Sequence, residues 1–149
     1  MRHDLQARPF VPDRLGSRFR TLVVVDDSAF WLERFCRLID PLPLIELVGT
    51  ALQGPEALHL ADVLRPDLVL MDLKMPLVNG LQATVLLRRR LRHVLVILMS
   101  SDDSPPAQAA ARAHGAHGFI WKPRVQSDLM TEIDRAFRLN ATDDQRSTL

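Results

Sequence analysis

The 149-residue chain has little of what marks secreted or membrane-spanning proteins. It holds a single cysteine, Cys36, which excludes an internal disulfide and fits a reducing cytoplasm. No early apolar stretch resembles a signal peptide, and no apolar run approaches the roughly 20 residues that a membrane-spanning helix needs. The fractions of apolar (47%) and charged (25%) residues are those of an ordinary globular protein. We therefore expect one cytoplasmic domain with a core of its own.

The chain also lacks a strong net charge, at +1, but its charge is unevenly placed. Residues 1–20 contain five arginines and two aspartates, whereas the remainder is slightly acidic. Pro9, Pro12 and Gly16 interrupt this segment. The pattern favours a basic, flexible arm over residues 1–19 rather than a segment that binds nucleic acid or an acidic lipid surface. The end of the chain, residues 140–149, is polar and too short to form a domain, so we expect the domain to span 20–139.

Short apolar runs alternate with longer amphipathic segments between these ends. We expect strands at Thr21–Val25, Leu44–Val48 (ended by Gly49), Asp67–Met71, Val94–Met99 and Gly118–Trp121. The expected helices are Ser28–Ile39, Pro55–Leu64, Leu81–Leu91, Pro105–Ala113 and Ser127–Leu139. Strands that are continuously apolar indicate a parallel sheet that is covered on both faces. The alternation predicts a doubly wound α/β fold.

Four of the apolar runs are followed directly by reactive polar residues. These are Asp26-Asp27, Asp72, Ser100 and Lys122-Pro123. In an open parallel sheet, ligands bind in the crevice beyond the carboxyl ends of the strands. If the runs are neighbouring parallel strands, three carboxylates, a hydroxyl and an ammonium group meet in one cleft.

The chemistry of this set points to a divalent cation and a phosphoryl group. Carboxylates that gather at adjacent strand ends repel one another, and a hard cation relieves that repulsion. Mg²⁺ prefers oxygen ligands, so Asp26, Asp27 and Asp72 suit it, and the lack of nearby cysteines argues against zinc. Asp72 is the candidate nucleophile for phosphorus. Lys122 can neutralise charge on the transferred group, and Ser100 can donate a hydrogen bond to it.

Each of these residues has an ordinary explanation when it is taken alone. Asp26, Asp27 or Ser28 would cap the next helix, and Lys122 would be a solvated lysine at a strand end. The argument depends on their common location. The arginine run at 88, 89, 90 and 92 is best explained as the solvated end of a helix, where cations favour the helix dipole, rather than as a nucleic-acid contact. The four histidines at 59, 93, 114 and 117 show no metal-ligand spacing and are expected at the surface or in loops.

From about residue 20 to residue 139, the chain resembles the receiver domain of two-component response regulators, the family of the single-domain chemotaxis regulators. Asp26 and Asp27 match the family's metal-binding acid pair. Asp72 matches the phosphoacceptor within a D-x-x-M-P-x-x-x-G motif that runs to Gly80. Ser100 stands at the switch Ser or Thr, and Lys122-Pro123 matches the family's lysine and proline. The resemblance implies a five-stranded flavodoxin-like sheet of strand order 2-1-3-4-5.

The resemblance implies further details of the site. The backbone carbonyl of Lys74 would be a ligand of Mg²⁺, and the Lys122–Pro123 peptide bond would be cis. Phe119 would be the aromatic switch residue, turning inward when Ser100 moves toward the phosphoryl group. The expected partner is a histidine kinase or a histidine phosphotransfer protein. A homodimer through the last two helices and the last strand is compatible with the family, whereas contact with a membrane or with nucleic acid is not expected for this chain alone.

The leading hypothesis is therefore a signalling switch of a two-component phosphorelay, phosphorylated on Asp72 with Mg²⁺. It would not be an enzyme apart from its own phosphotransfer and autodephosphorylation. The chain could act alone or as the receiver part of a longer transcription regulator. One alternative is a Mg²⁺-dependent phosphatase with an aspartyl-phosphate intermediate, but such enzymes place an acid two residues after the nucleophile, where this chain has Lys74. A receiver-like module that is never phosphorylated is disfavoured by the complete set of site residues.

Overall fold

The computed structural model describes residues 20–147, with side chains as far as residue 141. Five parallel strands form one sheet in the order β2-β1-β3-β4-β5. The strands are β1 (Arg20–Val25), β2 (Ile45–Ala51), β3 (Leu68–Asp72), β4 (Leu95–Ser100) and β5 (Gly118–Trp121). The α-helices are α1 (Ala29–Ile39), α2 (Gly54–Leu64), α3 (Gly80–Arg90), α4 (Pro105–Ala113) and α5 (Val125–Ser147), and a 3₁₀ turn, η1 (Lys122–Arg124), precedes α5. The predicted fold and strand order are confirmed.

Helices α1, α3 and α4 begin where a side chain accepts hydrogen bonds from their first backbone N–H groups. The Ser28 hydroxyl accepts a hydrogen bond from the backbone N–H of Trp31 at the start of α1. At the start of α3, the side chains of Asn79 and Gln82 each accept a hydrogen bond from the other residue's backbone N–H and so form a capping box. These caps fix the point at which each chain segment leaves the carboxyl edge of the sheet.

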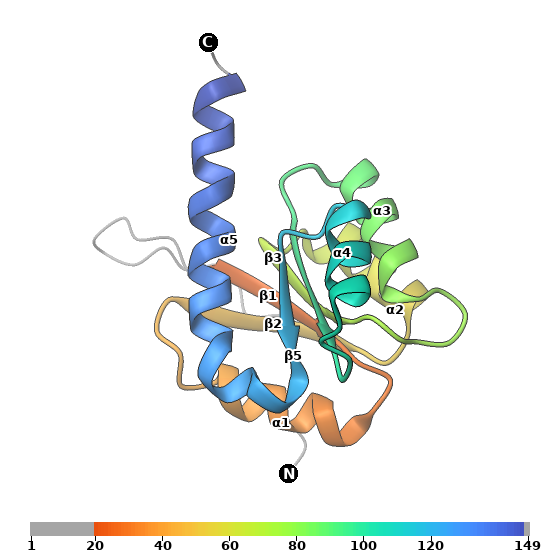
Figure 1. Cartoon of the computed structure of the whole chain (residues 1–149). Helices are drawn as coiled ribbons and strands as arrows, with labels where there is room; N and C mark the ends of the chain where they lie inside the picture. Colours follow the sequence, from red (N-terminus) through yellow and green to blue (C-terminus); the bar gives the residue numbers. More distant parts are fainter. Residues whose placement is uncertain (1–19, 148–149) are drawn as a thin grey trace.

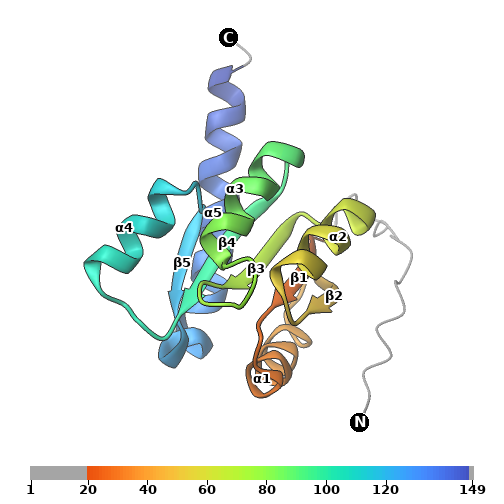
Figure 2. The same cartoon turned by 90° about the vertical axis from the view of Figure 1, so that its right-hand side faces the viewer.

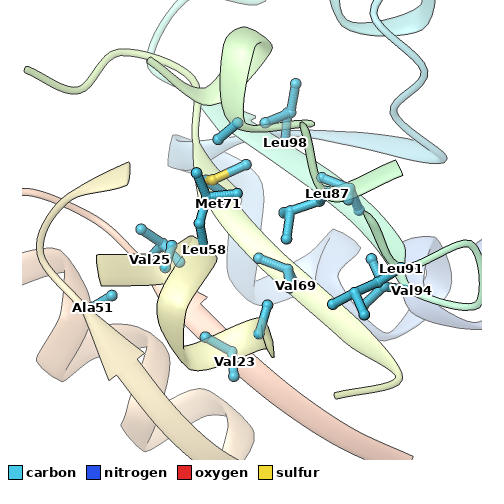
Figure 3. Packing of buried hydrophobic residues seen from close by; sticks show 14 of the residues in the cluster. Val23, Val25, Ala51, Leu58, Val69, Met71, Leu87, Leu91, Val94 and Leu98 are labelled. Atoms are coloured by element: carbon cyan, nitrogen blue, oxygen red, sulfur yellow. The ribbon is translucent and has the colours of Figure 1, made fainter. Parts of the chain in front are cut away.

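Helices cover both faces of the sheet, with α2, α3 and α4 on one side and α1 and α5 on the other (Figure 1). Val23, Val69 and Leu98 belong to the core under α2 and α3, which Figure 3 shows from close by. On the other face of the sheet, Leu22, Leu70 and further strand residues pack with Phe35 of α1 and with α5. Successive strand residues thus enter different cores, which explains why the strands are apolar throughout.

Two boundaries differ from the sequence prediction by more than two residues. β2 does not end before Gly49: it runs on to Ala51, because its pairing with β1 continues to Val25 after a β-bulge that leaves Val48 without a partner in the register. Helix α5 does not end near residue 139 but continues to Ser147, and it projects beyond the sheet in both views (Figures 1 and 2). The predicted arm at 1–19 lies outside the described residues. Within 20–147, no helix is both long enough and apolar enough to cross a bilayer.

Candidate functional site

The sheet brings the polar strand-end residues together at its carboxyl edge. β1 and β3 are neighbours, with Val25 opposite Met71, so the residues that follow in register are Asp26 and Asp72. β4 and β5 are paired with Ser100 opposite Trp121, and Lys122 comes directly after this pair. The residues predicted from four separate strands therefore meet at one place.

Three carboxylates form the centre of the site. Asp26, Asp27 and Asp72 each present an oxygen such that these atoms lie within 4.8 Å of one another. Asp26 is completely buried and Asp72 nearly so, whereas Asp27 is exposed. One oxygen of Asp26 accepts a hydrogen bond from the backbone N–H of Ser28 (2.9 Å), which orients its carboxylate. The cluster is thus built into the protein on one side and open to solvent on the other.

Lys122 is the buried cation that faces these carboxylates. Its Nζ lies 2.7 Å from Oδ2 of Asp26 and 3.3 Å from Oδ1 of Asp72. The same Nζ lies 5.1 Å from the centre of the Trp31 ring, within the range of a cation–π interaction. Trp31 in turn stacks on Phe35, with 5.5 Å between the ring centres. An aromatic side chain of α1 therefore forms one wall around the ammonium group.

The site keeps an excess of negative charge, and this changes the acidity of Asp72. Burial raises the pKa of Asp72 from its ordinary 3.8 to about 6, and the neighbouring Asp26 carboxylate adds to the rise. The Lys122 ammonium acts in the opposite direction without cancelling these effects. Asp72 is therefore ionised at neutral pH, as a nucleophile must be, but its ionised form is held in an unfavourable environment.

The arrangement fits a hard divalent cation. Oδ2 of Asp26 is buried and has no hydrogen bond of good geometry, although it is in ion-pair contact with Lys122. Three carboxylates with one exposed member provide oxygen ligands and leave room for water, which is the environment that Mg²⁺ prefers. Lys74, whose backbone carbonyl is the further predicted ligand, is exposed in the loop after β3.

Ser100 and Phe119 belong to β4 and β5, the two strands farthest from β2. Ser100 is buried, and its hydroxyl accepts a hydrogen bond from the backbone N–H of Asp102 (3.0 Å). Phe119 is half-buried and packs against the core under α2 and α3. Its backbone N–H, on the open edge of the sheet, donates to the Glu132 carboxylate at 3.4 Å.

The loop after Asp72 depends on a glycine. A Cβ at Gly80 would lie 2.4 Å from the backbone oxygen of Asp72 and 2.8 Å from the Cα of Leu73. Only a residue without a side chain allows the start of α3 to approach Asp72 this closely. The same loop contains Leu77 with a φ of 69°, in the left-handed region that a leucine rarely adopts.

The structure adds two contacts that the sequence did not indicate, and it contradicts one expectation. The Trp31 ring packs against the core and also faces Lys122. His117 lies in the loop before β5, as expected, but it is half-buried there and its Nδ1 accepts a hydrogen bond from the backbone N–H of Val96 (3.0 Å). The expected cis bond before Pro123 is absent, since none of the described peptide bonds is cis and Lys122–Arg124 forms a 3₁₀ turn instead. Contacts between distant segments decide the first two, and no local pattern reports them.

Comparison with known proteins identifies similar chains. The family model of the response regulator receiver domain matches residues 22–134. A protein-glutamate methylesterase/protein-glutamine glutaminase of Geobacillus kaustophilus is 40% identical over 106 residues, which are 68% of this chain and 30% of that protein. The protein-glutamate methylesterase/protein-glutamine glutaminase 2 of Photobacterium profundum is 32% identical over 121 residues, which are 79% of this chain and 30% of that protein. The chain thus spans about 30% of the length of these curated relatives.

Solved structures of the same architecture are also similar. The response regulator domain of Thermotoga maritima CheB has a TM-score of 0.73 and 31% identity, and the match covers 81% of this chain and 98% of that domain. The signal receiver domain of the response regulator NarL from Mycobacterium tuberculosis has a TM-score of 0.73 and 30% identity, and the match covers 78% of this chain and 95% of that domain.

Proposed function

The chain belongs to the family of response regulator receiver domains, and on this premise we propose that it is a phosphorylation-dependent switch of a two-component phosphorelay. Asp72 would accept the phosphoryl group from a histidine kinase or a histidine phosphotransfer protein. The observation that carries the proposal is the convergence of Asp26, Asp27 and Asp72 within 4.8 Å, with the Lys122 ammonium 3.3 Å from Asp72. This set offers a nucleophile, a cation-binding group and a fixed positive charge at one point.

The proposed reaction transfers the phosphoryl group from nitrogen to oxygen. An ionised oxygen of Asp72 attacks the phosphorus of a phosphohistidine, a P–O bond forms, and the P–N bond breaks to release the histidine of the partner. The protein contributes a desolvated carboxylate and the Lys122 ammonium, which stabilises charge on the phosphoryl oxygens. The Trp31 ring limits where that ammonium group can lie.

We propose that Mg²⁺ binds to Asp26, Asp27, Asp72 and the backbone carbonyl of Lys74. When it is bound, the ion supplies positive charge to the phosphoryl oxygens. The Asp26 oxygen without a hydrogen bond and the raised pKa of Asp72 both support this assignment, because a divalent ion would relieve each of them.

Ser100 and Phe119 would convert phosphorylation into a change of surface. The Ser100 hydroxyl must leave the backbone N–H of Asp102 to donate to a phosphoryl oxygen. Its movement would open space for Phe119, which has no hydroxyl and would hold its inward position by packing alone. Phosphorylation would then shift the balance between two existing states.

The direct test is intact mass measurement after incubation with acetyl phosphate and Mg²⁺. We expect the mass of one phosphoryl group on the wild type and on Asp103→Asn, a matched control at an exposed position. The adduct should be absent in Asp72→Asn and whenever EDTA replaces Mg²⁺. An adduct of equal yield on Asp72→Asn would refute the proposal.

Trp31 provides an independent optical test, since its ring faces Lys122 beside the carboxylates. Mg²⁺ titration should change the intrinsic tryptophan fluorescence of the wild type and of Trp121→Phe, but not that of Trp31→Phe. Trp121 is a suitable control because its indole N–H donates to the backbone oxygen of Ser101 (3.1 Å). A signal that survives in Trp31→Phe would place the ion elsewhere.

The alternative of a phosphatase that acts on external substrates has less support. The position two residues after the nucleophile is occupied by the exposed Lys74, which cannot act as a carboxylic acid there. The curated relatives are named as methylesterases, but this chain matches only about 30% of their length, and we propose for it the receiver role rather than their esterase activity. The single cysteine is compatible with the same role in the cytoplasm.

A further inference from the structure

A second charged site lies at the end of β5 that is opposite to the carboxylates. A cavity of about 640 Å³ is bordered by the end of α3, by α4, by the start of β5 and by α5. Figure 2 shows these four elements together. The size falls within the range of small-molecule sites, roughly 300–1,000 Å³.

The lining of this cavity is strongly basic. Four arginines contribute to it, namely Arg88, Arg92, Arg112 and Arg135, against the single carboxylate of Glu132. A smaller hollow of about 470 Å³ shares Arg88 and Arg92 and adds Arg89, with no acidic residue in its lining. We call the two together the arginine cavity.

Within the part of the chain that the structure describes, some of the arginine side chains have a hydrogen-bond or ion-pair partner and others have none. Arg90 turns away to pair with Asp62 of α2 at 3.2 Å, and so leaves the cavity. Arg88 donates to the backbone oxygen of Gly115, and Arg135 lies 3.2 Å from Glu132. The side chains of Arg92 and Arg112 make no hydrogen bond or ion pair with any described residue. At least two guanidinium groups are therefore free to bind a ligand at the cavity mouth.

The inner part of the cavity is already shaped. His117, Gly118 and Phe119 of the β5 segment line it, and Glu132 is fixed there by the backbone N–H of Phe119. His117 is held by the backbone N–H of Val96. The pKa of His117 is lowered to about 4, by burial first and then by the Arg88 charge, so the imidazole is neutral at physiological pH and the positive charge comes from the arginines.

We propose that the arginine cavity binds a small phosphorylated ligand of nucleotide size. Guanidinium groups bind phosphoryl oxygens through paired, charge-assisted hydrogen bonds, and several arginines around one hollow suit more than one phosphoryl group. The basic residues surround a concavity rather than forming a flat stripe, which favours a small molecule over a nucleic acid duplex. This inference does not depend on phosphorylation of Asp72.

Calorimetric titration with ATP tests the proposal, in EDTA so that no metal ion bridges the nucleotide to the carboxylates. Inorganic pyrophosphate and adenosine serve as further probes at matched ionic strength. We expect saturable 1:1 binding of ATP and of pyrophosphate, no binding of adenosine, and amide NMR shifts at Gly118 and Phe119. In Arg92→Ser/Arg112→Ser the affinity should fall at least about tenfold, because both guanidinium groups that are free to bind phosphoryl oxygens are removed.

Arg34→Ser/Arg37→Ser is the matched control, since it removes the same charge from the exposed side of α1. It should bind ATP as the wild type does. Unsaturable heats, equal binding of adenosine, or the same loss of affinity in both double variants would overturn the proposal. So would NMR shifts that avoid β5 and cluster at the carboxylates.

Discussion

The two charged pockets lie at opposite ends of β5, and they hold their charge in different ways. At the carboxyl end, one ammonium group faces three carboxylates, and Asp26, Asp72 and Lys122 are all less than 10% exposed. At the other end, several arginines face the single carboxylate of Glu132, and those arginines are exposed. One pocket is buried and depends on its counterion, whereas the other is solvated.

The difference follows from the cost of removing a charge from water. A buried charge that loses its partner is left without either water or a counterion, which costs several kcal/mol. An exposed guanidinium group retains its hydration and needs no partner. The acid pocket is the site formed by Asp26, Asp27, Asp72 and Lys122. We expect loss of the Lys122 charge to destabilise the protein strongly, and loss of the Glu132 charge from the arginine cavity to destabilise it little.

The largest effect is expected from Lys122→Met. Without the ammonium group, the buried Asp26 faces Asp72 uncompensated, and the free energy of unfolding should fall by about 3–5 kcal/mol at pH 7. Urea denaturation in EDTA measures it, and Mg²⁺ should restore part of the loss. Lys74→Met, at the chain's other lysine, is the control and should change stability by less than about 0.5 kcal/mol, since Lys74 is exposed.

The same experiment on the arginine cavity completes the comparison. Glu132→Gln removes its carboxylate charge but keeps an oxygen that can accept the backbone N–H of Phe119. We expect a loss of no more than about 1 kcal/mol. Equal losses in Lys122→Met and Glu132→Gln would mean that burial does not distinguish the two pockets.

Gly80→Ala tests how rigidly the acid pocket is built. We expect its effect to be somewhat smaller than that of Lys122→Met. The new Cβ would meet the backbone of Asp72 and Leu73, which cannot rotate away, and the expected loss of stability is about 3 kcal/mol. Gly49→Ala is the matched control, because its nearest neighbours would be side-chain atoms rather than backbone, the closest being the end of the Leu64 side chain at 3.1 Å. Similar losses in both variants, measured by thermal unfolding, would argue against a special constraint at Asp72.

His117 gives the arginine cavity a pH-dependent contribution to stability. The unfolded chain takes up a proton near pH 6.5, whereas the folded imidazole stays neutral down to about pH 4. Stability should therefore fall as the pH drops from about 6.5 toward 4, by about 1–2 kcal/mol after allowance for screening by water. His117→Asn, which keeps an acceptor for Val96 but cannot titrate, should flatten this pH profile. A profile that is unchanged in His117→Asn would contradict this account.

Asp72 contributes to stability with the opposite sign. Its pKa is about 6 in the folded protein against an ordinary 3.8, so its contribution is lost as the pH rises from about 4 through 6. Asp72→Asn should consequently be more stable than the wild type at pH 7, by about 1–2 kcal/mol when screening is allowed for, and equal to it at pH 4. Denaturation in EDTA measures the difference. A variant that is less stable than the wild type at pH 7 would show that the carboxylate is not strained.

Much of the acid pocket could be predicted from the sequence, because it depends on chain order. Each of Asp26, Asp72, Ser100 and Lys122 follows an apolar run, and parallel neighbours bring strand ends to one edge whatever fills the loops. The strand order itself came from the family resemblance. The end of β2 was missed because a glycine was taken as a stop, although pairing with β1 carries the strand past Gly49.

The arginine cavity could not be predicted in the same way. Its residues come from α3, α4, the β5 segment and α5, and in sequence they look like ordinary charged positions near helix ends. The interpretation of residues 88–92 as a solvated helix face holds for Arg90, which pairs with Asp62 on the surface. Arg88 and Arg92 are exposed as well, but the sequence does not show that they line a cavity, because α4 and α5 have to flank the end of α3 to form it.

The smallest effect concerns the loop between β3 and α3. Leu77 adopts a φ of 69° and is 78% exposed, so it bears left-handed strain while burying almost nothing. Leu77→Gly should raise the free energy of unfolding by about 0.5–1 kcal/mol, because relief of 1–2 kcal/mol of strain exceeds the added entropy of the unfolded chain. Leu77→Ala removes the exposed side chain but keeps the Cβ, and should change little. If alanine stabilises as much as glycine in urea denaturation, exposure of the leucine rather than its backbone conformation is the cause.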